Sequence, residues 1–149
     1  MRLRQAIAVL ALAGVFVSLY LWLHKLGVIG VLQCGTGGCD TVQASRYADF
    51  LGLPVALYGV VGYGVLFAVS LGAVQQAHAP RRRLDTVLAV LASLGFAFTL
   101  YLTAVELFVI HAICRWCVAS AIVATLLFLA ALFEVPTLLR QRSEASSFS

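Results

Sequence analysis

The chain has 149 residues, of which 62% are hydrophobic and only 11% are charged, and its mean hydropathy is +1.02. A water-soluble domain carries roughly 25% charged residues, so the composition excludes an ordinary soluble domain and indicates a protein surrounded by lipid. The net charge of +4 does not indicate a nucleic-acid-binding protein, because no basic stripe with stacking aromatic residues accompanies it.

Long apolar stretches predict transmembrane helices. A bilayer core of about 30 Å needs about 20 helical residues, at about 1.5 Å per residue. The uncharged runs are Ala6 to Leu23, Leu53 to Ala77, Thr86 to Val105 and Val118 to Phe133. Helices are therefore expected near residues 6–26, 54–76, 84–110 and 113–139. The predicted fold class is an all-α integral membrane protein, with a four-helix bundle as a single domain over residues 1–140.

The first apolar stretch is expected to be a membrane helix and not a cleaved signal peptide. Arg2 and Arg4 precede it, as in a signal peptide. The stretch is longer than the usual apolar region of a signal, and no small-residue cleavage site follows it before Leu26.

The basic residues predict the orientation. Seven lie on one side of the predicted spans, and three lie on the other. The seven are Arg2, Arg4, Arg81, Arg82, Arg83, Arg140 and Arg142, and the three are Lys25, Arg46 and Arg115. The positive-inside rule places both termini in the cytoplasm and the loop 27–52 outside.

Two polar segments lie outside the predicted spans. In the outer loop, a short helix is expected from Asp40, a favoured capping residue, to Gly52. Its apolar residues Val42, Phe50 and Leu51 are expected to cover the bundle. The tail 141–149 is polar and is expected to be disordered.

All four cysteines fall on the predicted outer side, in two close pairs. Cys34 and Cys39, the outer pair, lie in the loop, and Cys114 and Cys117, the inner pair, lie at the start of the fourth helix. Disulfides persist in oxidising compartments outside the cytoplasm. Three readings remain: redox-active dithiols, structural disulfides, and a zinc site. The spacing of three residues places the inner sulfurs as neighbours at a helix N-terminus, where the helix dipole and Arg115 favour thiolate. Redox chemistry is therefore the favoured reading.

Three stretches of the chain resemble bacterial homologues of vitamin K epoxide reductase. They are CDTVQAS, with Cys39 and Ser45; FLGLPVALYG; and YLTAVELFVIHAICRWCVAS, with both inner cysteines. A C-x-x-C motif alone is a weak signal, but this order of motifs is specific and the resemblance covers nearly the whole chain. Relatives often have more than the four residues found here between the loop cysteines.

The resemblance implies a quinone-coupled thiol oxidoreductase in the inner (plasma) membrane that supports disulfide bond formation. Electrons would pass from a thioredoxin-like extracytoplasmic oxidase to Cys34 and Cys39, then to Cys114 and Cys117. The final acceptor would be a quinone of the ubiquinone, menaquinone or phylloquinone type. Several relatives carry a fused thioredoxin-like domain; the chain ends at Ser149, so the partner is expected to be a separate protein. The family also implies that Cys117 contacts the quinone and that Cys39 and Cys114 form the transient bond between the pairs.

Four further residues are expected at the quinone site. Ser45 matches a loop serine that lies near the quinone in the family. Trp116 and Phe50 offer aromatic walls, and Glu106 is a carboxylate within a membrane span, where ionisable residues are usually functional. No metal ion is expected. The alternative function is a non-enzymatic membrane scaffold or transporter with structural disulfides.

Overall fold

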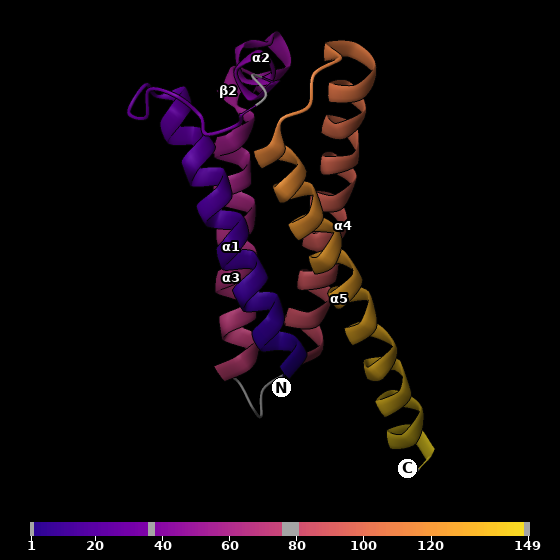
Figure 1. Cartoon of the computed structure of the whole chain (residues 1–149). Coiled ribbons are helices and arrows are strands. Elements are labelled where there is room, and N and C mark those ends of the chain that lie inside the picture. The colour runs from indigo at the N-terminus through magenta and orange to yellow at the C-terminus, as the bar shows by residue number, and fades with distance from the viewer. Residues whose placement is uncertain (1, 36–37, 76–80, 148–149) are drawn as a thin grey trace.

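The computed structural model describes residues 2–35, 38–75 and 81–147, and the side chains of all of these except residues 81–82 and 135–147. Long helices dominate the chain (Figure 1). The helices are α1 (Arg2–Lys25), α2 (Gly38–Ala44), α3 (Val55–Gln75), α4 (Arg81–Val105) and α5 (Arg115–Ser147). The shorter elements are the 3-10 helix η1 (Arg46–Ala48), the strands β1 (Asp49–Phe50) and β2 (Leu53–Pro54), and the π-helix η2 (Glu106–Ile110).

Four helices are long and apolar enough to cross a membrane, which confirms the predicted four-helix membrane bundle. The candidate spans are Arg2–Lys25, Val55–Gln75, Arg83–Ile110 and Arg115–Glu134. The last span begins two residues later than predicted, because the chain leaves the preceding helix at His111 and runs without helical structure to Cys114. Helix α5 then continues to Ser147, so the described part of the tail that was expected to be disordered, residues 141–147, is helical. Neither glycine nor proline interrupts residues 141–147, and most of them are good helix formers.

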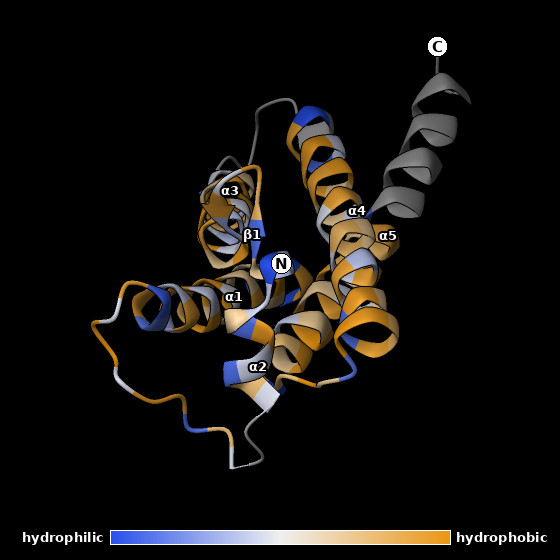
Figure 2. Ribbon diagram, turned by 90° about the horizontal axis from the view of Figure 1, so that it is seen from above, coloured by the Kyte–Doolittle hydropathy of each residue, from blue (hydrophilic) through white to orange (hydrophobic). Residues whose placement is uncertain are grey.

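The bundle has a buried apolar core and also leaves many large apolar residues on its outside. Ile7, Ala11, Tyr63, Leu66 and Leu127 belong to the buried core of the spans. The outer faces of the helices are also mostly hydrophobic (Figure 2), as expected where the solvent is lipid.

Helices α1 and α3 approach closely because glycines face bulkier groups. A Cβ atom on Gly14 would lie 2.5–2.7 Å from ring atoms of Tyr63, and one on Gly59 would lie 2.5 Å from Ser18 Oγ. Small residues at such crossings let membrane helices pack by van der Waals contact.

We expect Gly14→Ala to destabilise the bundle by about 1–3 kcal/mol, the usual cost of overpacking a filled core. The added methyl group would force the Tyr63 ring, and with it the hydrogen bond from Tyr63 Oη to the Ser120 carbonyl, out of place. The measurement is the midpoint of thermal unfolding in detergent. Gly64→Ala is the matched control, because a Cβ at Gly64 meets nothing within 4 Å. Equal midpoints for the two variants would contradict the packing argument.

Charged residues join the helices at the end of the bundle where both termini lie (Figure 1). Arg4 of α1 pairs with the buried Asp85 of α4 at 2.9 Å and with Glu134 of α5 at 3.6 Å. Its guanidinium also donates to the carbonyl of Ala73 on α3, at 3.2 Å. One arginine therefore contacts all of the other three spanning helices.

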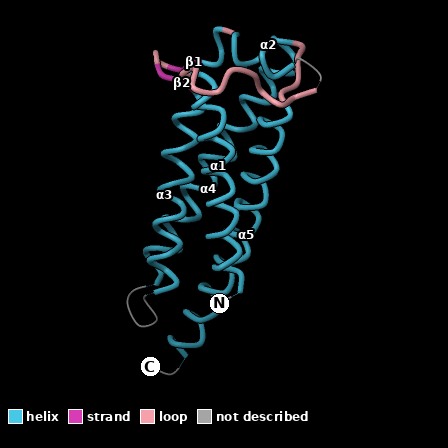
Figure 3. Tube along the Cα trace, turned by 60° about the vertical axis from the view of Figure 1, so that its left-hand side comes forward, coloured by secondary structure: helices cyan, strands magenta, loops and turns pink. Residues whose placement is uncertain are grey.

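The opposite end carries the segment that covers the bundle, residues 38–54, which we call the lid (Figure 3). Helix α1 ends before Gly27, whose φ of +76° permits the backbone bonds from Gly27 to His24 and from Val28 to Leu23 that form a Schellman motif. The lid consists of α2, η1 and a two-stranded hairpin in which Phe50 faces Leu53.

The prediction of one helix from Asp40 to Gly52 is therefore wrong in its extent. Helix α2 begins at Gly38, so Asp40 lies within its first turn and is not its cap. Ser45 has an extended backbone that separates α2 from η1. Leu51 and Gly52, with φ of 54° and 81°, form a two-residue hairpin turn of the kind that needs positive φ at both positions.

Two residues at the end of α1 attach the lid to the bundle. Lys25 Nζ donates to the carbonyl of Gln43 at the end of α2 and to Asp49 at 3.2 Å. His24 lies 3.7 Å from the Asp40 carboxylate. The valine at position 42 is buried beneath α2, whereas Phe50 and Leu51 are 41% and 85% exposed. Of the three apolar residues expected to cover the bundle, Val42 is thus the one that is buried, Phe50 packs its ring edge on Tyr58 and Phe98, and Leu51 is exposed.

Candidate active site: two cysteine pairs above an apolar cavity

The outer cysteines form a disulfide bond. Their Cα atoms are 6.1 Å apart, within the usual range for a disulfide. Cys39 lies in the first turn of α2, and Cys34 lies in the loop that leads to it. Both side chains are buried, with exposed fractions of 3% for Cys34 and 0% for Cys39.

The inner cysteines are thiols at the start of α5. Cys114 directly precedes the helix and accepts its first backbone bond, from Val118 at 2.9 Å, while Cys117 lies in the first turn. The predicted helical start at residue 113 is therefore corrected: only Cys117 is within the helix. The Cys117 backbone N–H points at Cys114 Sγ, at 3.4 Å.

This arrangement activates Cys114, which lies between the third and fourth membrane spans. A hydrogen bond from the Cys117 side chain, supported by the amides of Cys117 and Trp116, lowers the pKa of the Cys114 thiol. Burial and the nearby Glu106 carboxylate act in the opposite direction but are weaker than these bonds together. A thiol with a low pKa is also released readily in thiol–disulfide exchange, so this environment suits Cys114 for exchange with the outer pair.

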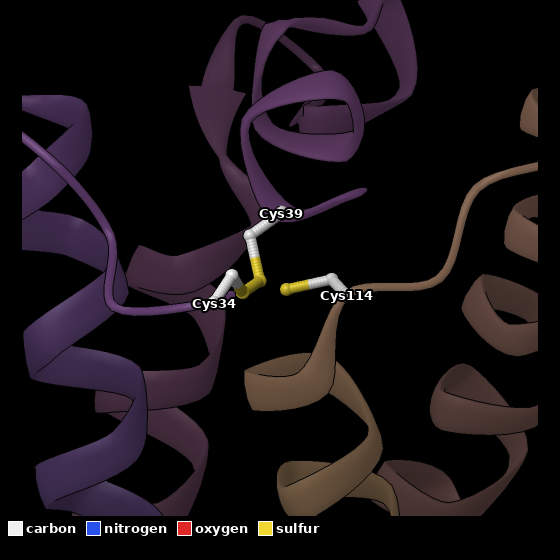
Figure 4. A group of neighbouring side chains, drawn as sticks. All are labelled: Cys34, Cys39 and Cys114. Atoms are coloured by element: carbon white, nitrogen blue, oxygen red, sulfur yellow. A yellow bond between two sulfur atoms is a disulfide. The ribbon is translucent and has the colours of Figure 1, made fainter. Parts of the chain in front are cut away.

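The two pairs meet at the entrance of the bundle. The sulfur atoms of Cys34, Cys39 and Cys114 lie within 4.8 Å of one another, and the Cys114 side chain points at the disulfide (Figure 4). The backbone brings them together because Gly38 lies against the carbonyl of Ile113, where a Cβ atom would clash. Arg115 adds a long hydrogen bond of 3.5 Å to the carbonyl of Cys34.

The same three sulfurs form the group that could hold a metal ion. Zinc and other soft cations bind thiolates, and the disulfide uses two of the three sulfurs in a covalent bond with each other. The arrangement in the structure is therefore that of a disulfide facing a thiol, which is the geometry of thiol–disulfide exchange.

An apolar cavity of about 290 Å³ lies beneath the lid, between the spanning helices. The spanning helices provide most of its wall, through residues such as Leu66, Leu91, Leu102 and Leu127. The lid provides the remainder through Val42, Gln43, Ser45, Tyr47 and Ala48. Two ionisable groups of the site, Cys117 and Glu106, also line the cavity. An apolar cavity with few convergent polar groups is the usual form of a small-molecule site.

The structure brings Ser45 and Glu106 to the cavity but leaves Phe50 and Trp116 off its wall. The Ser45 hydroxyl donates to the carbonyl of Val42 at 2.7 Å, so it closes α2 as well as lining the cavity. Phe50 lies behind the wall, with its ring 5.8 Å from that of Phe98 and 5.9 Å from that of Tyr58. Trp116 packs on Tyr20 of α1, with ring centroids 4.7 Å apart, because neighbouring helical positions point about 100° apart.

Three residues at the site were not identified from the sequence. Gly38 sets the approach of α2 to the inner pair, and Lys25 holds α2 and the hairpin in place. Tyr58 lines the cavity and donates to the carbonyl of Phe50 at 3.0 Å. A glycine directly before a cysteine is the one local signal for Gly38, whereas the other two contacts depend on tertiary structure.

A buried disulfide that faces a free thiol, at the end of a four-helix membrane bundle, defines the protein as a membrane thiol oxidoreductase with a redox-active centre. Residues 5–132 match the Vitamin K epoxide reductase family. Since this match covers most of the chain, the protein belongs to that family, as its motifs indicated.

Proposed function

We propose that the protein reoxidises a thioredoxin-like protein outside the cytoplasm and transfers the electrons to a membrane quinone. The observation that carries this proposal is the series of sulfurs from loop to cavity. The outer disulfide adjoins Cys114, Cys114 adjoins Cys117, and Cys117 lines the apolar cavity. A reducing equivalent can thus pass from the lid into the membrane by exchange between neighbouring sulfurs.

The proposed reaction consists of two thiol–disulfide exchanges and one reduction of quinone. A reduced partner gives its dithiol electrons to Cys34–Cys39 and leaves as a disulfide. The outer dithiol then reduces the inner disulfide, so that Cys34–Cys39 is a disulfide again and Cys114 and Cys117 are thiols. The described structure has this distribution of thiols and disulfide. Finally, two electrons and two protons pass from the inner dithiol to the quinone.

The cavity fits the head of a quinone in its chemistry. Its lining is mainly aliphatic and aromatic, and the side chains of Gln43, Thr99 and Thr103 are among its polar groups. A quinone ring needs an apolar slot and hydrogen-bond donors for its carbonyl oxygens. Cys117, at the inner end of the sulfur series, is the cysteine that reaches this cavity. These features support a ubiquinone, menaquinone or phylloquinone type of acceptor.

Access by the partner requires the loop to move. Cys34 is only 3% exposed, so a protein thiol cannot reach its sulfur in the described arrangement. Gly35, with φ of +68°, leaves the backbone beside Cys34 free to adopt conformations that other residues rarely reach. We infer that the loop opens toward the partner with Cys34 at its tip, while α2 keeps Cys39 near the inner pair.

The charge distribution supports cytoplasmic termini and extracytoplasmic cysteines in the inner (plasma) membrane. Both termini, the end of α3 and the start of α4 lie at the end of the bundle opposite the lid (Figure 1), and seven of the ten basic residues belong to that end. The positive-inside rule then assigns the lid to the outer face.

The decisive experiment couples the purified protein, in detergent or nanodiscs, to a reduced thioredoxin-like protein and a soluble quinone analogue. We expect the loss of partner thiols and the loss of quinone absorbance to proceed at equal molar rates. A scaffold or transporter with structural disulfides would show neither reaction, and its cysteines would keep their redox state when quinone is added. That result would overturn the proposal.

A further inference from the structure

We propose that Glu106 accepts the proton of the Cys117 thiol when the inner pair is oxidised, and delivers it toward the acceptor in the cavity. This inference rests on the proposed quinone-coupled function and adds the proton path that such a reaction requires. Glu106 lies within the third span yet is buried, with an exposed fraction of 7%.

Burying the Glu106 carboxylate within a membrane span costs free energy, which indicates a functional role. A carboxylate in a membrane span loses its hydration and is usually retained for a functional reason. No salt bridge joins Glu106 to a basic side chain among the residues whose side chains are described. A buried ionisable group without a counter-ion is suited to change its protonation state, because neither state is fixed by a partner charge.

The contacts of Glu106 are with the reacting cysteines. Its Oε2 accepts a hydrogen bond from the backbone N–H of Cys114 at 3.4 Å, and its carboxylate also interacts with the Cys117 side chain. The same residue lines the cavity, as does Cys117. Glu106 therefore touches a reacting sulfur on one side and the cavity on the other.

The local backbone places the carboxylate there. Glu106 is the first residue of the π-helix η2, which ends at His111 with a φ of 54°. Single π-helical turns within α-helices occur frequently at functional sites, since they alter the direction of the side chains. The wider turn precedes the linker that carries Cys114 and thus couples the carboxylate to the inner pair.

The proton balance gives Glu106 a defined task. Oxidation of the inner dithiol forms the Cys114–Cys117 disulfide and releases two electrons and two protons, which the quinone gains. Cys114 has a lowered pKa and loses its proton readily, whereas Cys117 lies deeper, on the wall of the apolar cavity. Glu106 takes the Cys117 proton and returns it through the cavity to the reduced acceptor.

Most other ionisable groups near η2 are engaged with other partners or face solvent. Asp40 of α2 faces His24, and the Tyr63 hydroxyl of α3 is bonded to Ser120. Tyr47 and Tyr58 also line the cavity, and the Tyr58 hydroxyl donates to the carbonyl of Phe50. Arg115 at the start of α5 is directed to the carbonyl of Cys34, and His111 is exposed.

The test is Glu106→Gln, which keeps the shape and an oxygen for the Cys114 amide but cannot take a proton. With dithiothreitol as donor and a quinone analogue as acceptor, we expect kcat at neutral pH to fall about 100-fold, at the lower end of general-base effects. The loss should shrink as pH rises, because hydroxide can then take the Cys117 proton in place of the missing base. Glu106→Asp should retain more activity than the glutamine variant.

Two controls separate proton transfer from structure. Glu134→Gln, a partly buried carboxylate at the other end of the bundle, should leave the pH profile unchanged. Trapping of a Cys39–Cys114 disulfide in a Cys34→Ser, Cys117→Ser background should be equally efficient with Gln at position 106. An unchanged kcat and pH profile for Glu106→Gln would overturn the inference, as would a loss that is equal at all pH values and accompanied by poor trapping. Failure of the wild-type protein to reduce quinone would instead refute the proposed function itself.

Discussion

Replacing Cys117 by serine is expected to abolish quinone reduction, with a fall in kcat of at least about 1,000-fold, whatever the electron donor. Cys117 is the cysteine that lines the apolar cavity, and its sulfur must join Cys114 when electrons leave the inner pair. A serine hydroxyl cannot form a disulfide, so two-electron chemistry ends at Cys114. The reaction is measured as quinone absorbance with dithiothreitol as donor, which reaches the inner pair without help from the lid.

Replacing both outer cysteines by serine should have a different result. Dithiothreitol-driven quinone reduction should continue within a few-fold of wild type, because the inner pair and the cavity are unchanged. Turnover with a reduced thioredoxin-like protein should be lost, since Cys34 and Cys39 form the disulfide that is carried by the lid and the loop before it. The double variant is thus a matched control for Cys117→Ser. If Cys117→Ser still reduced quinone normally, or the two donors failed equally in the outer-pair variant, the division of labour would be wrong.

The sequence was sufficient to predict the features that lipid imposes. A span needs an uninterrupted apolar run, so the four membrane helices and their order could be read from the positions of charged residues. The location of the four cysteines was also predictable, because their positions relative to the spans bring both pairs to one end of the bundle. Periodicity within the spans did not show which face of each helix points into the bundle, since helices in lipid are apolar on all sides.

The details of the lid were not predictable because they depend on contacts between distant segments. Ser45 interrupts the helix, and the chain then forms η1 and a hairpin instead of continuing to Gly52. The lid is held by Lys25, which lies in another helix. Local propensity could not reveal this contact, and a short helix in a loop has too few residues to be stable by itself.

The directions of single side chains were also beyond sequence reasoning. Trp116 is adjacent to Cys117 in the chain, but a rotation of about 100° per residue turns it toward Tyr20 and away from the cavity. Glu106 was recognisable as unusual from its place in a span, whereas the π-helical turn that brings it to Cys114 was not. Such turns insert one residue into the helical register and leave no clear mark in the sequence.

The final expected result concerns the bond that joins the two pairs. A protein with Cys34→Ser and Cys117→Ser retains Cys39 and Cys114, and under mild oxidation it should form a Cys39–Cys114 disulfide in most molecules. The two sulfurs lie within 4.8 Å in the native arrangement, so the oxidant can join them without a large movement of the lid. Peptide mass after non-reducing digestion identifies the bond.

The preference for Cys39 over Cys34 follows from what holds each residue. Cys39 belongs to α2, which is fixed against the Ile113 carbonyl through Gly38, whereas Cys34 lies in a loop beside Gly35. Gly38→Ala would push α2 away from that carbonyl and should reduce trapping several-fold, while Gly30→Ala, where a Cβ atom meets nothing within 4 Å, should not. The complementary protein with Cys39→Ser and Cys117→Ser should trap Cys34 with Cys114 less efficiently. If Cys34 were trapped preferentially, the bond between the pairs would form through Cys34, and Cys39 would be the cysteine left for the partner, which contradicts the proposed route.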